Sequence, residues 1–354
     1  FAGNGNDTIY ASNSGSTIFG RNGDDTIIGR DGNDNLNGGD GNDTLNGGSG
    51  NDTLIGGAGS DTMDGGEGLD SIAYWNETNS IIIDMENQTA SGVDIGNDTF
   101  SNIERAFGGK GNDIISAANS GSIMWGGQGD DTLTGKSGND RISGGSGNDI
   151  IDGGDGFDDI AFWSATNSII IDMEAGTASG DVNEVGDDTF ANIERVFSGN
   201  GDDTIKAANS GSVIYGRGGN DTIIGRVGND FLIGGNGNDN ISGGAGKDIL
   251  TGGSGADTFI YNFFSDSSPT INSADIIKDF EQGTDKIDLN ELNLIEQFIT
   301  FDENPNDNNT PDGLSYHFDN DNNTIITHQD EDANRDFAIK LAGHIDLNNG
   351  DFNF

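Results

Sequence analysis

A nine-residue repeat constrains the fold of this chain more than any other feature. The sequence divides into nine-residue units without a gap over residues 2–73, 108–161 and 198–260, which gives runs of 8, 6 and 7 units. A typical unit reads GGDGNDTLN, at residues 38–46. Self-similarity at a short fixed period is the signature of a solenoid, in which each repeat packs on its neighbours. The chain is therefore expected to stack repeats and not to fold around one globular core.

Each position of the unit has a physical interpretation. Glycines at the first, second and fourth positions permit positive φ and close backbone approach, and Asn or Asp at the fifth tolerates the left-handed region. The eighth position is apolar, as in Leu36, Leu45 and Ile151. Six residues then form a turn and three form a short strand with one buried side chain, so that two units complete one rung. The predicted fold is all-β, a parallel β-roll solenoid.

The sixth position of the unit is aspartate in eighteen of the 21 units. Stacked turns place these carboxylates close to backbone carbonyls of adjacent rungs. Hard oxygen ligands without His or Cys suit Ca²⁺ and not Zn²⁺ or copper. The candidate metal ligands are Asp7, Asp25, Asp34, Asp43, Asp52, Asp61, Asp70, Asp113, Asp131, Asp140, Asp149, Asp158, Asp203, Asp221, Asp230, Asp239, Asp248 and Asp257.

The charge balance limits the possible partners. The chain has 61 acidic residues against 15 Lys and Arg, a formal net charge of -46, and no cysteine. Nucleic acids and anionic membranes need clustered cations, so neither is expected as a partner. No segment has the roughly 18 apolar residues of a membrane helix, so membrane insertion is not expected. Glycine entropy and acidic repulsion oppose folding, which predicts that the repeats stay unfolded until cations bind.

The unit resembles the G-G-x-G-x-D-x-U-x repeat of the RTX (repeats-in-toxin) family of secreted calcium-binding β-rolls. The competing interpretation, a flexible Gly/Asp tract, does not account for three unbroken frames. The resemblance implies one Ca²⁺ between each turn and the next turn on the same side, roughly a dozen ions in total. It also implies a chain that is unfolded in the cytosol, passes through an exporter, and folds on calcium outside the cell.

The second unit of every run is irregular. Residues 11–19, 117–125 and 207–215 keep the length and the apolar eighth position but lack the aspartate and most glycines. We expect these units to stack without binding calcium. Two units later, a cation stands in place of the second glycine, at Arg30, Lys136 and Arg226. One hypothesis is that this side chain replaces the charge of the absent ion, and the alternative is a solvated surface cation.

A longer repeat of 88 to 90 residues contains the short one, because 73–92 recurs at 161–180 and 98–122 at 188–212. The segments between runs are expected to be calcium-free and β-rich, with strands near 81–83 and 169–171. Trp75, Trp125 and Trp163 predict either packing of these segments against the roll or carbohydrate stacking. Phe1 aligns with Phe107 and Phe197, which predicts further residues upstream. The expected domains are 1–73, 108–161 and 198–260 as β-roll blocks, 74–107 and 162–197 as interludes, and 261–354 as a C-terminal domain.

The C-terminal segment departs from the repeat. SADIIKDFEQGTDKIDLNEL (273–292) and DFAIKLAGHIDLNNGDFNF (336–354) resemble the region that follows the β-roll in serralysin-type secreted proteases. That resemblance implies a small β-sandwich with an uncleaved type I secretion signal, and hence a type I exporter as a partner. DNDNNTIITHQD (319–330) is similar to an EF-hand, but Thr324 and Asp330 replace the required Gly and Glu. A β-hairpin is the preferred interpretation.

No catalytic constellation accompanies these motifs. H-E-x-x-H is absent, and His317, His328 and His344 are not spaced as ligands. The chain is therefore expected not to be an enzyme. The leading hypothesis is a secreted calcium-binding protein that serves as an extracellular structural or surface component, with self-assembly or contact with a cell surface or polysaccharide. The alternative is the C-terminal export and folding module of a larger secreted protease, lipase or polysaccharide-modifying enzyme.

Overall fold

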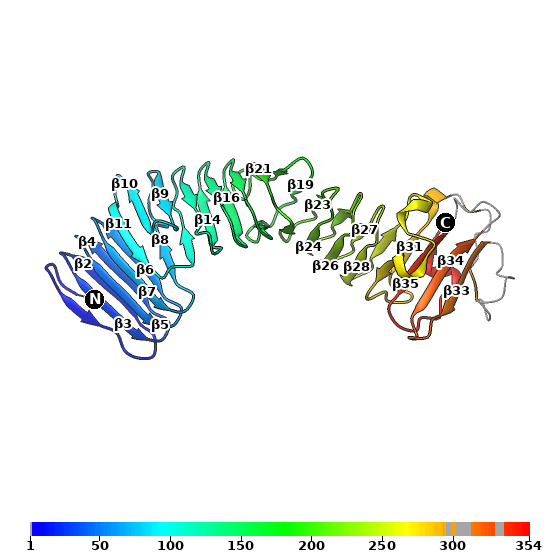
Figure 1. The fold of residues 1–354 in the computed structure, drawn as a ribbon, viewed down its shortest axis with the longest axis horizontal. Coiled ribbons are helices and arrows are strands. Elements are labelled where there is room, and N and C mark those ends of the chain that lie inside the picture. The colour runs from blue at the N-terminus through cyan, green and yellow to red at the C-terminus, as the bar shows by residue number, and fades with distance from the viewer. Residues whose placement is uncertain (1, 293, 295–298, 302–312, 330–335) are drawn as a thin grey trace. The chain divides into compact units, whose positions relative to one another are not determined.

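The computed structural model describes residues 2–292, 294, 299–301, 313–329 and 336–354. Phe1, used above for the long-repeat alignment, and Asp330, the last residue of the EF-hand-like segment, lie outside these residues. The described chain consists of short strands and a few 3-10 turns, without an α-helix, which confirms the predicted all-β fold (Figure 1). It divides into two compact units, 1–161 with 182–193, and 162–181 with 194–354. These units do not follow the boundaries of the repeat blocks.

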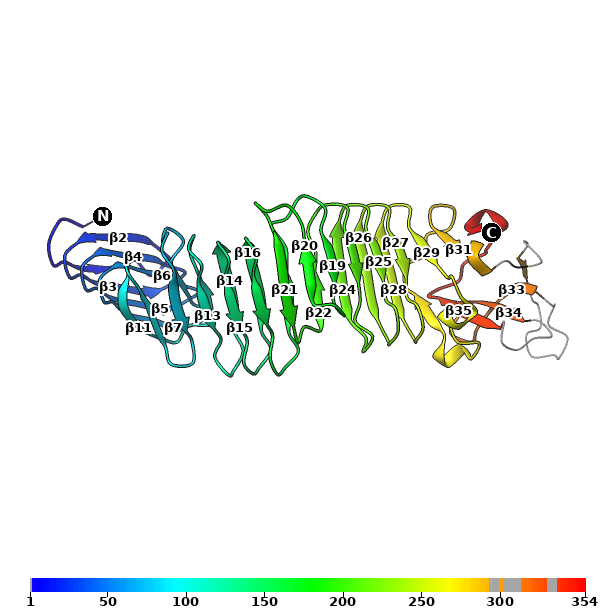
Figure 2. The ribbon, with the colours of Figure 1, turned by 90° about the horizontal axis from the view of Figure 1, so that it is seen from above.

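The first unit has two sheets, and within each repeat run successive strands belong to one sheet and the other in turn. Figure 2 shows the strands stacked side by side. The first sheet contains β2 (Thr17–Asn22), β4 (Asn35–Asp40), β6 (Thr53–Ala58), β8 (Ser71–Ala73), β12 (Arg105–Phe107), β14 (Ile123–Gln128), β16 (Arg141–Ser146) and β18 (Asp159–Ala161). The second contains β1 (Thr8–Tyr10), β3 (Thr26–Asp31), β5 (Thr44–Ser49), β7 (Thr62–Glu67), β9 (Ile81–Asp84), β10 (Thr89–Gly92), β11 (Gly96–Ser101), β13 (Ile114–Ser116), β15 (Thr132–Thr134), β17 (Ile150–Asp152) and β21 (Asp187–Ala191).

Within a run of repeats, each strand pairs in parallel with the strand two units further along the chain. Leu36 of β4 pairs with Leu54 of β6, and Leu45 of β5 pairs with Met63 of β7. These eighth-position side chains are at most 1% exposed, and they form a continuous apolar column between the sheets. Close approach requires glycine at Gly39, which has φ 112° and where a Cβ would lie 2.0 Å from the carbonyl oxygen of Arg21. Two units therefore complete one rung, as the sequence predicts.

The first interlude continues the solenoid. β9 pairs antiparallel with β10, which pairs antiparallel with β11, and β11 then pairs in parallel with β7. β9 also pairs in parallel with β13 of the following run. A three-stranded meander thus joins two parallel stacks, and the strand expected near 81–83 is present.

The second unit repeats this arrangement. One sheet contains β22 (Arg195–Phe197), β24 (Val213–Gly218), β26 (Phe231–Asn236), β28 (Ile249–Ser254), β30 (Asp275–Ile277), β32 (Thr300–Phe301), β33 (Gly313–Phe318), β34 (Thr324–Gln329) and β35 (Phe337–Leu341). The other contains β19 (Ile170–Asp172), β20 (Thr177–Ser179), β23 (Thr204–Lys206), β25 (Thr222–Ile224), β27 (Asn240–Ser242), β29 (Thr258–Ile260), β31 (Lys286–Asp288) and β36 (Phe352–Asn353). The 3-10 turns are η1 (Phe264–Asp266), η2 (Ile271–Ser273), η3 (Asn290–Leu292) and η5 (Asn349–Asp351).

The C-terminal segment is built onto both sheets of the second unit. β30 pairs in parallel with β28, β31 pairs with β29, and the terminal β36 pairs with β31. β33 and β34 form the predicted hairpin, in which Asp319 accepts hydrogen bonds from the backbone N–H groups of Asp321 and Asn323. No helix in the described ranges is long and apolar enough to cross a membrane.

Candidate metal sites

The sixth-position aspartates stack in columns, with each carboxylate bonded to the preceding rung. The Oδ1 atom of Asp52 accepts a hydrogen bond from the backbone N–H of Asp34 at 2.7 Å, and Asp61 accepts one from Asp43 at 2.7 Å. The backbone carbonyl of Asp34 accepts from the N–H of Thr53, which fixes the aspartate at the start of a strand. We call these stacks the aspartate columns; they are 7–25–43–61–98, 34–52–70, 113–131–149–188, 140–158, 203–221–239–257–285 and 230–248–275.

The second carboxylate oxygen of most column members is buried without a hydrogen-bond partner. Asp52 is fully buried, and its Oδ2 atom has no donor among the described residues. A Cβ built on Gly47 would lie 2.3 Å from that oxygen and 2.5 Å from the carbonyl oxygen of Gly65. Glycine therefore leaves a small cradle bounded by a carboxylate and a carbonyl from the next rung. An unsatisfied buried carboxylate is costly, so each cradle favours a cation.

The donor set fits calcium. The cradles contain only carboxylate and carbonyl oxygens, which hard divalent cations prefer. Within the part of the chain that the structure describes, no three acidic or histidine side chains converge on one point. A site in a column therefore combines at most two carboxylates with backbone carbonyls, a set that is poor for Zn²⁺ or copper.

Fifteen of the eighteen predicted ligands have the orphaned Oδ2 atom, and the first unit of each run is the exception. Asp113 accepts from the backbone N–H groups of Gly109 and Ile81. Asp203 accepts from the Ser198 hydroxyl and from the N–H groups of Gly199 and Ile169. Asp7 is partly exposed and accepts from the N–H of Gly3. At these three positions the protein itself supplies a hydrogen-bond donor to the carboxylate oxygen that lacks one in the other predicted ligands.

Four column members were missed by the sequence analysis. Asp98 and Asp188 lie in the interludes and accept from the N–H groups of Asp61 and Asp149, while Asp275 and Asp285 lie in the C-terminal segment. The tripeptide Asp-Thr-Phe at 98–100 and 188–190 repeats the Asp-Thr-apolar pattern of the unit and is the signal that could have found the first two. Separations of 37 and 39 residues, instead of 18, hid it.

Burial raises the pKa of the column carboxyls above their usual 3.8. The pKa reaches about 8 at Asp131 and Asp188, about 7 at Asp221 and about 9 at Asp275, with loss of hydration as the largest cause and neighbouring carboxylates adding to it. The folded chain without cations thus favours protons on these groups.

Acidification is expected to stabilise the calcium-free fold. A carboxyl whose pKa rises on folding stabilises the folded state fully below its unfolded value, near 4, and loses that contribution as pH rises through its folded value, which is about 8 at Asp131. In chelator, the β signal in circular dichroism should therefore fall as pH rises from about 4 to 8. In calcium the sign reverses, because protons compete with the metal for the carboxylates. Equal signals at both pH values in chelator would contradict this.

The cations two units after each irregular repeat are partnered. The Arg226 guanidinium donates to both carboxylate oxygens of Asp172, at 2.8 and 2.6 Å, and to the carbonyl of Ala207 at 2.9 Å. This pair lowers the pKa of Asp172. Ala207 is the first residue of the irregular unit, in the position of the cradle carbonyl. The solvated-cation alternative is therefore wrong for Arg226.

The other two cations make related contacts. Lys136 forms an ion pair with Asp84 at 3.2 Å, and Arg30 donates to the carbonyl of Ala11 at 3.3 Å. In the irregular units of the second and third runs, Ser122 and Ser212 stand where the aspartate would be, and their N–H groups donate to Asp140 and Asp230. That these units bind no calcium stays a prediction.

Arg226→Gln is expected to destabilise the calcium-saturated chain by about 1–2 kcal/mol, because it removes charge-assisted bonds to Asp172 and leaves the Ala207 carbonyl without its donor. Thermal unfolding at saturating calcium measures the change. Lys110→Gln, which removes a cation that has no ion-pair partner among the described residues, is the control. Equal melting temperatures for the two variants would show that Arg226 has no structural role.

Comparison with known proteins agrees with the geometry. A family model described as the RTX calcium-binding nonapeptide repeat (4 copies) matches residues 1–36, 37–72, 94–119 and 125–160. A second, described as Peptidase M10 serralysin C terminal, matches residues 183–353. The third repeat match includes Asp98. A search of curated proteins found no match.

Solved structures with some likeness include two solution structures from the Azotobacter vinelandii mannuronan C5-epimerase. The AlgE6R2 subunit is 28% identical, with TM-score 0.25, over 43% of this chain and 88% of that one. The AlgE6R3 subunit is 28% identical, with TM-score 0.23, over 43% of this chain and 78% of that one. The extracellular lipase LipA from Serratia marcescens is 16% identical, with TM-score 0.19, over 71% of this chain and 40% of that one.

Proposed function

Because this chain belongs to the RTX family of calcium-binding nonapeptide-repeat proteins and ends in a serralysin-type C-terminal domain, we propose that it is a non-enzymatic structural component outside the cell. The chain is a calcium-binding protein secreted by the type I route, and it works in the extracellular medium. The role as a matrix, filament, adhesin or surface-layer component is the proposed part, together with self-assembly or surface contact.

The continuity of the aspartate columns is the observation that carries the structural role. In the first unit, Asp61 donates its N–H to Asp98, so the column of the first run continues into the interlude. In the second unit, Asp248 and Asp257 donate to Asp275 and Asp285 of the C-terminal segment. The columns thus join the repeats to an interlude and to the C-terminal segment. Asp188 and Asp275 keep the orphaned Oδ2 atom of the repeat sites, whereas Tyr74 and Glu281 donate hydrogen bonds to the Oδ2 atoms of Asp98 and Asp285. Such continuity suits a structural element more than a set of separate binding loops.

The column aspartates and the first-position glycine carbonyls would hold the ions. When bound, calcium supplies positive charge next to the orphaned Oδ2 atoms. We infer roughly a dozen ions per chain, in the weak extracellular class with Kd of roughly 10⁻⁴ to 10⁻³ M. At the low calcium of the cytosol, the unneutralised carboxylates repel one another and keep the repeats open for export.

The second candidate function is an export and folding module of a larger secreted enzyme. It is favoured by the match of residues 183–353 to the C-terminal part of a peptidase family. In that case the substrate-binding and catalytic groups belong to a segment outside this sequence, and this chain supplies calcium-dependent folding.

Negative-stain electron microscopy of the chain in about 5 mM calcium, well above the Kd of such extracellular sites, tests the structural role against a chelated sample. Ordered filaments or sheets that dissolve in chelator are expected. Isolated particles at every calcium concentration would contradict self-assembly and favour the module.

A further inference from the structure

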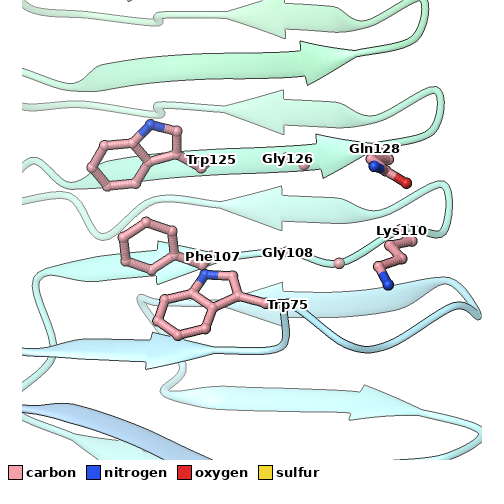
Figure 3. Close-up of a pocket in the computed structure, with 9 residues that line it drawn as sticks. Trp75, Phe107, Gly108, Lys110, Trp125, Gly126 and Gln128 are labelled. Atoms are coloured by element: carbon pink, nitrogen blue, oxygen red, sulfur yellow. The ribbon is translucent and has the colours of Figure 1, made fainter. Parts of the chain in front are cut away.

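A small groove opens on the outer surface of the first sheet of the first unit, between β8, β12 and β14. Its volume is about 200 Å³. The rings of Trp75, Phe107 and Trp125 line one end, and the side chains of Lys110 and Gln128 lie at the other, as Figure 3 shows. The floor between them consists of the glycines at 108, 109, 126 and 127. The groove thus has an apolar end, a polar end and a floor without side chains.

The aromatic end is a fixed wall. Phe107 and Trp125 are register partners on β12 and β14, and their rings stack at 4.4 Å with an interplanar angle of 2°. Trp75 packs against Phe107 at 5.5 Å and 72°, and it remains 45% exposed. Stacking against Phe107 fixes the wall, while the edge-on contact leaves part of the Trp75 ring open to solvent. Such a half-exposed aromatic ring suits a ligand with an apolar face.

The polar end carries the only charge on the groove. Lys110 and Gln128 are exposed, and the Lys110 ammonium has no ion-pair partner among the described residues. The remaining lining is aromatic or glycine. The lining residues of the groove thus carry one positive charge and no negative one, in a chain of net charge -46. Glu77 is an acid beside the floor, because its Cβ lies 3.2 Å from the position that a Cβ on Gly109 would take, but it does not line the groove. Repulsion from more distant acids is screened over about 8–10 Å at physiological salt, so the Lys110 ammonium is the charge that a ligand anion in the groove can contact.

A second copy of these residues exists in the second unit, without the groove floor. Trp163, Phe197 and Tyr215 correspond to the three rings, and Phe197 stacks on Tyr215 at 4.7 Å. At the position of Gly127, this copy has Arg217. The Arg217 guanidinium donates to the carbonyls of Trp163 and Ser198, which are the counterparts of Trp75 and Gly108, and therefore lies across the floor. Asn200 replaces Lys110, so the cation of the polar end is also missing.

We propose that the groove of the first unit binds one carboxylated pyranose ring of an acidic extracellular polysaccharide. The C–H face of the sugar packs on Trp75, its carboxylate pairs with Lys110, and its hydroxyl groups bond to Gln128. The volume is below the roughly 300–1,000 Å³ of pockets for drug-sized ligands, so it accommodates a single ring of a chain that continues into solvent. This proposal rests on the proposed function, because it assigns a ligand to the extracellular surface role.

The test uses the full chain, saturated with calcium, and two probes of equal length: a β-1,4-linked oligomer of glucuronic acid and the matching neutral gluco-oligosaccharide. Isothermal titration calorimetry and saturation-transfer NMR measure binding at a fixed free calcium concentration. We expect a Kd on the order of 1 mM for the acidic oligomer, which corresponds to about -4.1 kcal/mol, and at least about fivefold weaker binding of the neutral one. No binding of the acidic oligomer, or equal binding of both, overturns the proposal.

Four variants locate the site. Trp75→Ala should weaken binding of the acidic oligomer at least about tenfold by removing the exposed ring. Gly127→Arg should do the same by filling the groove as Arg217 does in the other copy. Lys110→Gln should remove the preference for the acidic oligomer, whereas Trp163→Ala should leave binding unchanged. Each variant must retain the calcium-dependent circular dichroism of the parent.

Equal weakening by Trp75→Ala and Trp163→Ala, or full binding by Gly127→Arg, would place the sugar elsewhere and overturn the assignment. The electron-microscopy test of self-assembly is carried out without the oligosaccharide. Failure of this proposal is therefore distinguishable from failure of the structural role.

Discussion

Replacing Asp52 by alanine is expected to destabilise the calcium-saturated chain by about 4 kcal/mol. The loss combines a hydrogen bond to the N–H of Asp34, with a cost of about 1–3 kcal/mol when a buried donor is orphaned, and ligation of the ions on either side of the carboxylate. Each ion stabilises by about 1.4 kcal/mol at ten times its Kd. Asp52 is fully buried in the middle of its column, so water cannot replace the lost oxygen. Thermal unfolding in saturating calcium measures the change.

Glu67→Ala is the matched control, because Glu67 is an acid of the same run that is exposed at the end of β7. Its loss should change stability by no more than about 0.5 kcal/mol. The dependence on calcium separates the two causes. The destabilisation should shrink as free calcium is lowered towards the concentration at which the parent unfolds, because less ligation is then lost while the hydrogen bond is lost at every concentration. A loss of stability that does not change with free calcium would show that Asp52 acts only through its hydrogen bond.

Removing calcium is expected to unfold both units. A set of about twelve ions, each present at ten times its Kd, supplies on the order of 15 kcal/mol. That is as large as the whole stability of an ordinary domain, about 5–15 kcal/mol. Excess chelator at pH 7.5 should therefore abolish most of the β signal in circular dichroism and increase the hydrodynamic radius, and calcium should restore both. Magnesium is the control, because its smaller, near-octahedral coordination fits the cradles poorly.

A chelated chain that keeps its β signal at pH 7.5 would contradict this account. It would mean that the apolar column, with side chains such as Leu36 and Leu54, suffices to hold the rungs together against carboxylate repulsion.

The period of the sequence predicted most of the fold because the unit length fixes the register. Once two units make a rung, Leu36 must lie beside Leu54, and Asp34 beside Asp52. The buried apolar column and the aspartate columns both follow from the fact that two units make one rung. The hairpin preferred over an EF-hand for 319–330 is present as the antiparallel pair β33 and β34.

Contacts that depend on how an interlude folds back onto the repeats could not be predicted from the sequence. Asp98 joins the column of Asp61 only because β9 and β10 fold back as a meander and bring β11 beside β7. Asp113 accepts from the N–H of Ile81 for the same reason, since the chain enters the run from the interlude, whereas its bond from Gly109 is local to the unit. These contacts depend on the strand pairing of the interlude and not on the nine-residue period of the sequence.

The groove of the first unit could not be predicted from the sequence either. In the sequence, Gly127 and Arg217 are a single difference between two copies of the long repeat. Only the hydrogen bonds of Arg217 to Trp163 and Ser198 show that one copy fills a space that the other leaves open.

The most direct test of the central claim is a crystal structure of the chain in calcium, with the ions located by anomalous scattering. The account predicts roughly a dozen ions in rows, each next to an orphaned Oδ2 atom such as those of Asp43 and Asp52. Ions should be absent where Arg226 contacts Ala207. Ordered repeats with intact aspartate columns but no ions beside these oxygens would contradict it.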